Sequence, residues 1–216
     1  MAGSASQHFD MGLTSGGVLV VAYYDEATNQ LKFTYNATPV NGSGLYGGSF
    51  AAPLDLDTTY NGTYVSLHVN SLNHIHIAYY GSASADLKYI YLQDYLDTTP
   101  SIARVDAYRS VGLWTDVRTT AGGVPYIAYD NNSENGSRDS IKLAYHLGSL
   151  PTVLDGVDDV GEVTGAWECL TVPVRDMPQG GLPQFNQANL GFDTSGDPTI
   201  GYLADDIEYS NFLPEL

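Results

Sequence analysis

Cysteine is almost absent from the sequence, and this excludes several kinds of site. Cys169 is the single cysteine among 216 residues, so the chain can form neither an intrachain disulfide nor a cysteine-based zinc or haem motif. It lies in the apolar run AWECLTV, which favours a buried small side chain over a nucleophile. Apolar runs are also short, and none reaches the 18 residues that suggest a membrane-spanning helix. We therefore expect no membrane span.

Basic residues are scarce. Eight lysines and arginines face 25 acidic residues, which gives a net charge of −17 and an isoelectric point near 4.2. Such a surface repels phosphate backbones, so we expect no nucleic-acid partner. The start MAGSAS lacks the basic and apolar regions of a signal peptide. We interpret it as a start codon joined to a domain whose export signal was removed, and we expect a secreted, periplasmic or cell-surface protein.

Strong helix formers are few, and the residues that are common favour strands. The 17 tyrosines and 23 glycines predict strands joined by turns. One segment recurs four times, and the copies align without a gap over about fourteen residues before a shared tyrosine. Each copy is followed by a second short run that is typical of a strand. The shared tyrosines are Tyr23, Tyr79, Tyr129 and Tyr202, and the short runs cover residues 31–35, 87–91, 141–145 and 207–210.

The spacing of the copies predicts a β-propeller. The shared tyrosines are 56, 50 and 73 residues apart, and four-stranded repeats of roughly 40–50 residues are typical of propeller blades. A blade has two apolar faces that it buries against its neighbours. We predict one all-β propeller domain over residues 1–216, either a four-bladed ring or part of a larger ring completed by another chain. The expected blades cover residues 7–57, 63–111, 113–175 and 187–212, with an irregular insertion at 147–186.

The fourth repeat ends after three strands. We expect residues 1–7 to supply its outer strand, or another chain to close the ring. A homodimer would then be eight-bladed or a side-by-side pair. The insertion at 147–186 breaks the repeat, and we expect function particular to this protein to lie there.

The repeat itself carries a family resemblance. Its pattern is S/D-L-x-V, a turn, P/H-x-I-A-Y-Y/D, a turn and L-K-Y, seen at residues 66–69, 74–80, 87–89, 125–130, 141–143 and 198–202. This pattern resembles the tandem blade repeats of bacterial secreted and surface β-propeller proteins. The resemblance covers about two thirds of the chain and fails over 147–186. It implies a propeller fold and says almost nothing of the ligand.

Polar residues share one face of the predicted inner strands. The alternate positions, Met11 and Leu13 among them, are apolar and should pack between blades. The polar face would line the channel mouth, where propellers commonly bind ligands. Alternatively, these side chains join neighbouring blades and order water, and we favour this structural role. Asp10, Ser66, Asp116 and Asn189 share one position in the alignment, and His68 and Arg118 share the position two residues later.

Two interpretations of function remain open. The first is a non-catalytic binding or assembly module that recognises a protein or glycan partner through the channel mouth or the loops. The second is a carbohydrate-active enzyme, a glycosidase or lyase, in which Asp10 and Asp116 form a carboxylate pair. The sequence contains no Gly-x-Ser-x-Gly elbow and no visible pairing of histidine with serine or cysteine. We therefore favour the binding module.

Metal binding has two candidates. His74 and His76 share one face of a strand and could chelate a transition metal with a third ligand, although hydrogen-bonded strand histidines are the simpler interpretation. The loop at 130–139 alternates oxygen donors suited to calcium but departs from the EF-hand spacing, so a solvated turn is the default. We expect no other cofactor. The calcium ligands would be Asp130, Asn132, Glu134 and Asp139.

A lysine recurs after the leucine or isoleucine of the second short run. Lys32, Lys88 and Lys142 occupy this position, and the fourth repeat has Glu208 there. One cation at the same place in three blades predicts an ion pair between blades, or a lysine stem packed along tyrosine rings.

Overall fold

A computed structural model describes residues 8–38, 47–59, 62–108, 110–131, 140–148, 166–172, 186–203 and 207–211. Within these ranges the regular elements are β-strands, so the all-β prediction is confirmed. The same ranges contain no helix that is long and apolar enough to cross a membrane.

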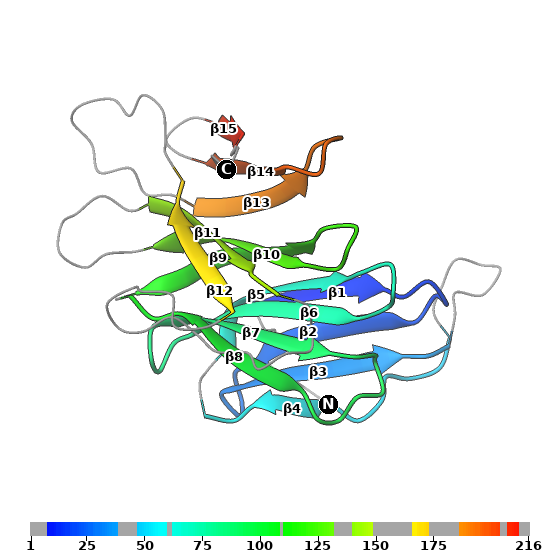
Figure 1. Cartoon of the computed structure of the whole chain (residues 1–216). Coiled ribbons are helices and arrows are strands. Elements are labelled where there is room, and N and C mark those ends of the chain that lie inside the picture. Colours follow the sequence, from blue (N-terminus) through cyan, green and yellow to red (C-terminus); the bar gives the residue numbers. More distant parts are fainter. Residues whose placement is uncertain are drawn as a thin grey trace.

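The strands form four antiparallel sheets, one for each sequence repeat (Figure 1). Consecutive strands pair in order within every sheet, and we number the sheets blades 1 to 4 along the chain. Blade 1 contains β1 (Phe9–Leu13), β2 (Leu19–Asp25), β3 (Gln30–Asn36) and β4 (Leu54–Asp57); blade 2 contains β5 (Gly62–Val69), β6 (Ile75–Gly81), β7 (Asp86–Leu92) and β8 (Ser101–Asp106); blade 3 contains β9 (Val111–Thr119), β10 (Pro125–Asn131), β11 (Ser140–His146) and β12 (Trp167–Thr171); blade 4 contains β13 (Asn186–Phe192), β14 (Pro198–Leu203) and β15 (Ile207–Asn211).

The first strands of successive blades pack against one another. β1 contacts β5, β5 contacts β9, and β9 contacts β13. In Figure 1 the blades therefore follow one another in sequence order, with blades 1 and 4 at opposite ends of the series. Four sheets in series agree with the predicted repeats. Closure into a four-bladed ring stays a prediction, as does the outer strand from residues 1–7, which lie outside the described residues.

The same four-residue turn joins the first two strands of every blade. Its first residue has a side-chain oxygen that accepts a hydrogen bond from the backbone N–H four residues later, over 3.0–3.2 Å. Its fourth residue has a positive φ, which glycine and asparagine tolerate best. This shared turn supports the alignment of the repeats. The turns are Thr14–Gly17, Asn70–Asn73, Thr120–Gly123 and Asp193–Gly196.

The core of the molecule lies between the blades. Each interface has its own cluster of buried apolar side chains, and three of the shared tyrosines, Tyr79, Tyr129 and Tyr202, are buried in the three clusters. We call the face of a blade towards the preceding blade its back face and the opposite face its front face. Neither face of a blade could be buried by one sheet alone, which is why the repeats stack.

A tyrosine, a lysine and an aspartate meet at the first two interfaces. Tyr79 donates a hydrogen bond to Asp57 of blade 1 over 2.7 Å, and Lys88 lies 3.4 Å from the same oxygen. Between blades 2 and 3, Asp106 accepts a hydrogen bond from the Tyr129 hydroxyl over 2.6 Å and also forms an ion pair with Lys142. The Lys142 nitrogen lies 5.6 Å from the centre of the Tyr129 ring. The predicted ion pair between blades is therefore present for Lys88 and Lys142. The prediction was wrong for Lys32, which pairs with Asp25 and Asp55 of its own blade.

The prediction for the apolar side chains of the first strand was wrong in one blade. Leu67, Val117 and Leu190 are buried between blades as expected, but Met11 is 58% and Leu13 56% exposed. The periodicity of apolar residues is the same in all four repeats, yet no blade within the described ranges covers the back face of blade 1. A strand does pass through the irregular segment 147–186, since β12 completes blade 3.

Candidate functional site at the inner strands

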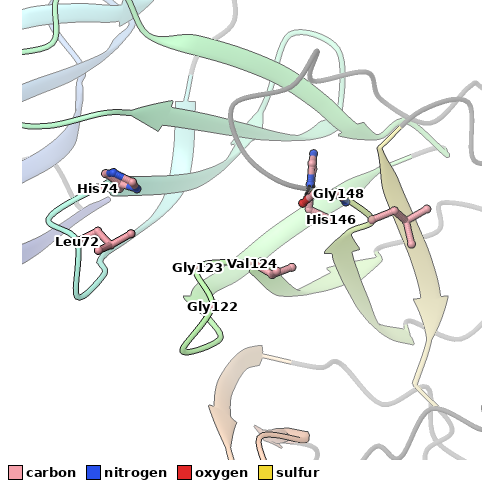
Figure 2. A pocket seen from close by; sticks show the side chains of 8 residues that line it. Leu72, His74, Gly122, Gly123, Val124, His146 and Gly148 are labelled. Carbon is pink, nitrogen blue, oxygen red and sulfur yellow. Dashed lines mark hydrogen bonds between the residues drawn. The ribbon is translucent and has the colours of Figure 1, made fainter.

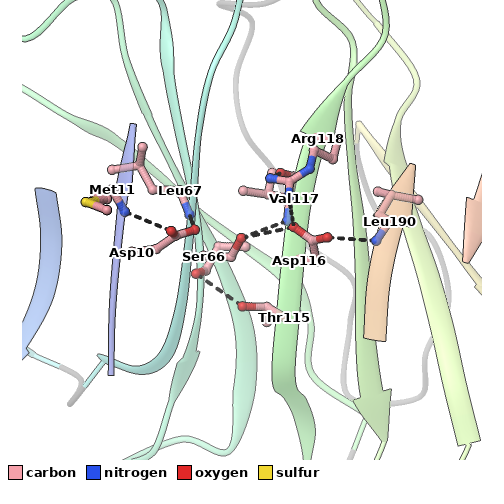
Figure 3. Close-up of polar contacts among 10 residues, drawn as sticks. Asp10, Met11, Ser66, Leu67, Thr115, Asp116, Val117, Arg118 and Leu190 are labelled. Carbon is pink, nitrogen blue, oxygen red and sulfur yellow. Dashed lines mark hydrogen bonds and ion pairs between the residues drawn. The ribbon is translucent and has the colours of Figure 1, made fainter. Parts of the chain in front are cut away.

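The predicted polar residues join consecutive blades through one repeated hydrogen bond. In each case a side-chain oxygen on the first strand of one blade accepts the backbone N–H of the first strand of the next blade (Figure 3). The side chain is at the shared polar position, and the N–H belongs to the residue after that position in the next repeat. The bonds run from Leu67 N to Asp10 Oδ2 over 2.8 Å, from Val117 N to Ser66 Oγ over 3.1 Å and from Leu190 N to Asp116 Oδ2 over 2.7 Å.

Asp116 lies at the centre of this arrangement. Its Oδ1 atom is 3.1 Å from Arg118 and accepts a 3.4 Å hydrogen bond from Ser66. The residue is only 6% exposed. Burial raises the pKa of Asp116, while Arg118 and the Leu190 amide act in the opposite direction. Both carboxylate oxygens are therefore occupied by protein groups.

Asp10 is similarly engaged. Its Oδ1 atom accepts the N–H of Met11 over 2.8 Å, and its Oδ2 atom accepts that of Leu67. Ser66 lies between Asp10 and Asp116 in Figure 3, so the two carboxylates come from blades separated by one sheet. The structural role that we favoured for this column is thus visible in its hydrogen bonds. Ligand binding by these residues stays a prediction.

Five of the six predicted residues line a common pocket of about 270 Å³. We call it the axial groove, because the first strands of all four blades contribute to it. The sixth predicted residue, His68, lies opposite His76 with ring centres 6.3 Å apart. Burial lowers the pKa of His68, and the positive charge of Arg118 lowers it further. The groove is lined by Asp10, Val65, Ser66, Trp114, Thr115, Asp116, Arg118, Ala188 and Asn189.

A row of aromatic rings begins at the groove, where Trp114 is one of the lining residues, and the sequence prediction missed it. The rings of His8 and Tyr64 are 4.7 Å apart, and those of Tyr64 and Trp114 are 4.9 Å apart. Each residue stands two places before the polar position of its repeat, so the recurrence of rings in that alignment column is the signal that could have revealed them. Tyr64 and Trp114 have φ angles of 51° and 50°, in the left-handed region. Non-glycine residues held there carry local strain, which is concentrated at functional sites.

Register shifts explain this backbone geometry. The pairing of β5 with β6 slips between Thr63 and Ser66, and that of β9 with β10 slips between Ala128 and Asp130, as at β-bulges. Bulges re-aim a side chain relative to the sheet. The Thr115 hydroxyl donates a hydrogen bond to the Tyr64 carbonyl and so connects the two bulges. The blades therefore hold the two aromatic rings side by side.

The histidines of the second repeat are not arranged for chelation. His76 is fully buried, with Nδ1 2.6 Å from the Tyr89 hydroxyl and Nε2 3.2 Å from the Asn70 amide. Burial lowers its pKa to about 3. His74 instead packs edge-on against Tyr91. Hydrogen-bonded strand histidines, the simpler interpretation, therefore describe His76.

No group of three potential metal ligands from histidine, cysteine, aspartate and glutamate occurs in the described part of the chain. Of the candidate calcium ligands, Asp130 is buried at the end of β10, opposite Ile141. Asn132, Glu134 and Asp139 lie outside the described residues. Calcium binding stays a prediction.

A second pocket of about 420 Å³ opens beside the turns of blades 2 and 3 (Figure 2). His74 and His146 stand on its opposite sides. His146 is buried, its Nδ1 atom is 2.8 Å from the Gly148 carbonyl, and its ring meets Trp167 edge-on. Among the described residues that line it there is no carboxylate and no lysine or arginine, and the titratable side chains of this lining are the imidazoles of His74 and His146.

Comparison with known proteins gives the fold alone. No protein-family model matches the chain, and no curated protein sequence matches it. Among solved structures, a protein of unknown function from Dyadobacter fermentans is similar with a TM-score of 0.57 and 12% identity over 92% of this chain. The chain spans 62% of the length of that protein.

Two further solved structures are similar at 12% identity. One is an α-L-arabinanase from Cellvibrio cellulosa, with a TM-score of 0.51, covering 94% of this chain and 70% of its own. The other is an exo-β-1,3-galactanase from Clostridium thermocellum, with a TM-score of 0.52, covering 95% of this chain and 46% of its own. These bacterial proteins have β-propeller-like folds, and the present chain has a fold of this type.

Proposed function

We propose that the chain is a non-catalytic module of an exported bacterial protein and binds a glycan in the axial groove. The observation that carries the proposal is the row of His8, Tyr64 and Trp114, in which Tyr64 and Trp114 are held at bulged strands and Trp114 lines the groove beside its polar side chains. Aromatic rings pack against the apolar faces of sugar rings, while carboxylate, guanidinium and amide groups bind the hydroxyls. Arg118, whose side chain is 39% exposed, is accessible for such contacts.

The state of the carboxylates supports binding over catalysis. A glycosidase needs two carboxyl groups whose oxygens can reach the scissile bond. In this chain both oxygens of Asp10 and both of Asp116 hold backbone or side-chain donors of the protein. Removing either carboxylate would first break hydrogen bonds between blades, and any effect on a bound ligand would come second.

The binding test uses the intrinsic fluorescence of Trp114. The chain has two tryptophans, and Trp167 is 1% exposed, so a ligand that enters the groove should change mainly the Trp114 emission. The probes are linear arabino-oligosaccharides and β-1,3-galacto-oligosaccharides, chosen because the similar solved structures are an arabinanase and a galactanase. Calorimetric titration then gives the affinity.

The variants Trp114→Ala and Tyr64→Ala should each weaken binding about tenfold. Tyr95→Ala is the matched control, because the Tyr95 ring packs edge-on against Tyr35 and Tyr95 is not among the residues that line the groove. If neither oligosaccharide binds, or if Trp114→Ala binds as tightly as the parent, the proposal is wrong.

A glycosidase or lyase is the second candidate, because one observation favours it. Burial raises the pKa of Asp116, as a general acid requires. The test is release of reducing sugars from arabinan and β-1,3-galactan by the parent chain and by Asp116→Asn. Turnover that disappears in a folded Asp116→Asn variant would replace the binding proposal with an enzyme, whereas no turnover in the parent supports the module.

A further inference from the structure

The back face of blade 1 is apolar, and no other described residue covers it. Phe9, Met11 and Leu13 are 58%, 58% and 56% exposed, and all three lie on this face of β1. They pair with Tyr23, Val21 and Leu19 of β2, so the apolar face continues across two strands. Large apolar patches of this kind mark interaction sites.

The equivalent faces of blades 2 and 3 show what such a face contacts. In blade 2, Leu67 and Val69 correspond to Met11 and Leu13, and they pack onto Gly12 of blade 1. A Cβ atom added to Gly12 would lie 2.6 Å from Cγ2 of Val69 and 2.9 Å from Cδ2 of Leu67. The absence of a side chain at Gly12 therefore makes the close contact between these blades possible.

The front face of blade 4 repeats the features of the front face of blade 1. Gly191 stands in the position of Gly12, and a Cβ atom added to it or to Gly201 would meet no described atom within 4 Å. Asn189 stands in the position of Asp10 and is exposed. Its side-chain oxygen could accept the backbone N–H of a following blade, as Asp10, Ser66 and Asp116 do.

We propose that blade 4 of one copy of this chain packs its front face onto the back face of blade 1 of a second copy. Met11 and Leu13 of the second copy then lie on Gly191, as Leu67 and Val69 lie on Gly12. The Met11 N–H, which donates to its own neighbour Asp10 in the single chain, donates to Asn189 of the other copy. The new interface continues the interfaces already present between the blades.

The charges fit this partner. At the internal interfaces Lys88 and Lys142 bind an aspartate at the end of the preceding blade's fourth strand. Lys32 of blade 1 instead binds Asp25 and Asp55 of its own blade, over 3.4 and 3.1 Å. Blade 1 therefore needs no aspartate from a preceding blade, and the described strands of blade 4 include no fourth strand to provide one.

The first test is the mass in solution. Light scattering of the full chain over a concentration series should give at least twice the chain mass of 23.2 kDa. Because each copy carries a charge of −17, association should strengthen as sodium chloride screens their repulsion. Met11→Glu and Gly191→Leu should each return the protein to the single-chain mass, since Gly191 has room for a side chain in the single chain. Leu96→Glu, which changes an equally exposed leucine outside both faces, should leave the mass unchanged.

The second test identifies the two faces. In a Cys169→Ala background, Met11→Cys and Asn189→Cys proteins are oxidised separately and as a mixture, then run without reductant. A cross-linked dimer that forms in the mixture, and not with either protein alone, supports the head-to-tail contact. A single-chain mass at all concentrations, or dimers from Met11→Cys alone, would overturn it. So would a protein carrying both cysteines that cross-links only within one chain. Failure of this test leaves the glycan proposal unaffected, because the glycan experiments are read at Trp114 and Tyr64, which take no part in the proposed contact; Asn189 is shared by the two sites, so the glycan experiments use the parent sequence at this position.

Discussion

The interfaces between blades 1 and 2 and between blades 2 and 3 are built differently from the interface between blades 3 and 4. Each of the first two contains a buried tyrosine–aspartate–lysine group. At the third, Tyr202 is opposite Glu208 in the strand register, where the earlier blades have a lysine. Val172, hydrogen-bonded to Ile141, takes the place of the aspartate. The third interface thus changed both charged positions together.

From this difference we expect the buried charges to act as a unit. An aspartate left without its lysine, or a lysine without its aspartate, would be an uncompensated charge in a low-dielectric interior. Replacing the aspartate with a buried valine removes the need for the cation. The three interfaces therefore show two arrangements of the same repeat, one with a buried aspartate and lysine and one with a valine in place of the aspartate.

Breaking one polar group should have the largest effect. Asp106→Ala leaves Lys142 and the Tyr129 hydroxyl buried without their acceptor, and we expect a loss of about 3–5 kcal/mol of unfolding free energy. Urea unfolding followed by circular dichroism measures it. The double variant Asp106→Val, Lys142→Met places the valine of the third interface at residue 106 and removes the cation, so it should lose less than Asp106→Ala alone. An equal or greater loss in the double variant would contradict the idea of a self-consistent unit.

A pH titration should distinguish the second interface from the third. An unfolded histidine binds a proton near pH 6.5, but His76 has a pKa of about 3, so the unfolded state takes up the proton first as the pH falls. Its contribution to stability is complete above pH 6.5 and is lost towards pH 3. Between pH 7.5 and 5 we expect a loss of about 2 kcal/mol that His76→Gln lacks. The third interface has Tyr126 at this position, stacked on Tyr145. Identical pH profiles for parent and variant would be evidence against the buried neutral histidine.

Two equivalent glycines allow a covered front face to be compared with an uncovered one. Gly12 lies on the front face of blade 1, which blade 2 covers, and Gly191 lies on the front face of blade 4. Gly12→Ala places a methyl group against Val69 and Leu67, and we expect a cost of about 1 kcal/mol, because these side chains can shift only slightly. Gly191→Ala meets no described atom and should be neutral or slightly stabilising. Thermal unfolding at low protein concentration, where copies are separate, measures both. Equal losses would mean that the two faces do not differ as described.

Breaking the solvent-exposed ion pair of Lys32 in blade 1 should have the smallest effect on the free energy of unfolding. Asp55→Ala removes a carboxylate that is 46% exposed and leaves Lys32 with Asp25, so we expect a loss of less than about 1 kcal/mol. The same urea unfolding assay, in low and high salt, checks it. A loss comparable to that of Asp106→Ala would show that solvent exposure does not account for the difference between the Lys32 and Lys142 groups.

Much of this architecture could be predicted from the repeat alone. The apolar core before Tyr79 and its copies fixed the central strand of each blade, and the polar column fixed the inner strand. The recurring lysine predicted the ion pair between blades. Each of these signals recurs at a constant distance from a shared tyrosine, so one alignment contains them all.

Other features left no periodic signal. The aspartates that bind the lysines, Asp57 and Asp106, end the fourth strands, whose sequences differ most between repeats. The left-handed backbone of Tyr64 and Trp114 depends on bulges that a pattern of residue types does not encode. Nor could the alternation of apolar residues show that Met11 and Leu13 are uncovered, since the pattern is the same whether a neighbour is present or absent.

The hydrogen bond between inner strands has a consequence for how such a chain can change over time. Its acceptor is a side chain of one blade, but its donor is a main-chain N–H, which every residue except proline possesses. A duplicated or exchanged repeat can therefore donate its main-chain N–H to the preceding blade whatever its sequence. It needs only one short polar side chain of its own to accept the N–H of the following blade. Asp10, Ser66 and Asp116 already show two chemical solutions for that residue. Units joined in this way can diverge in sequence without matched substitutions in their neighbours.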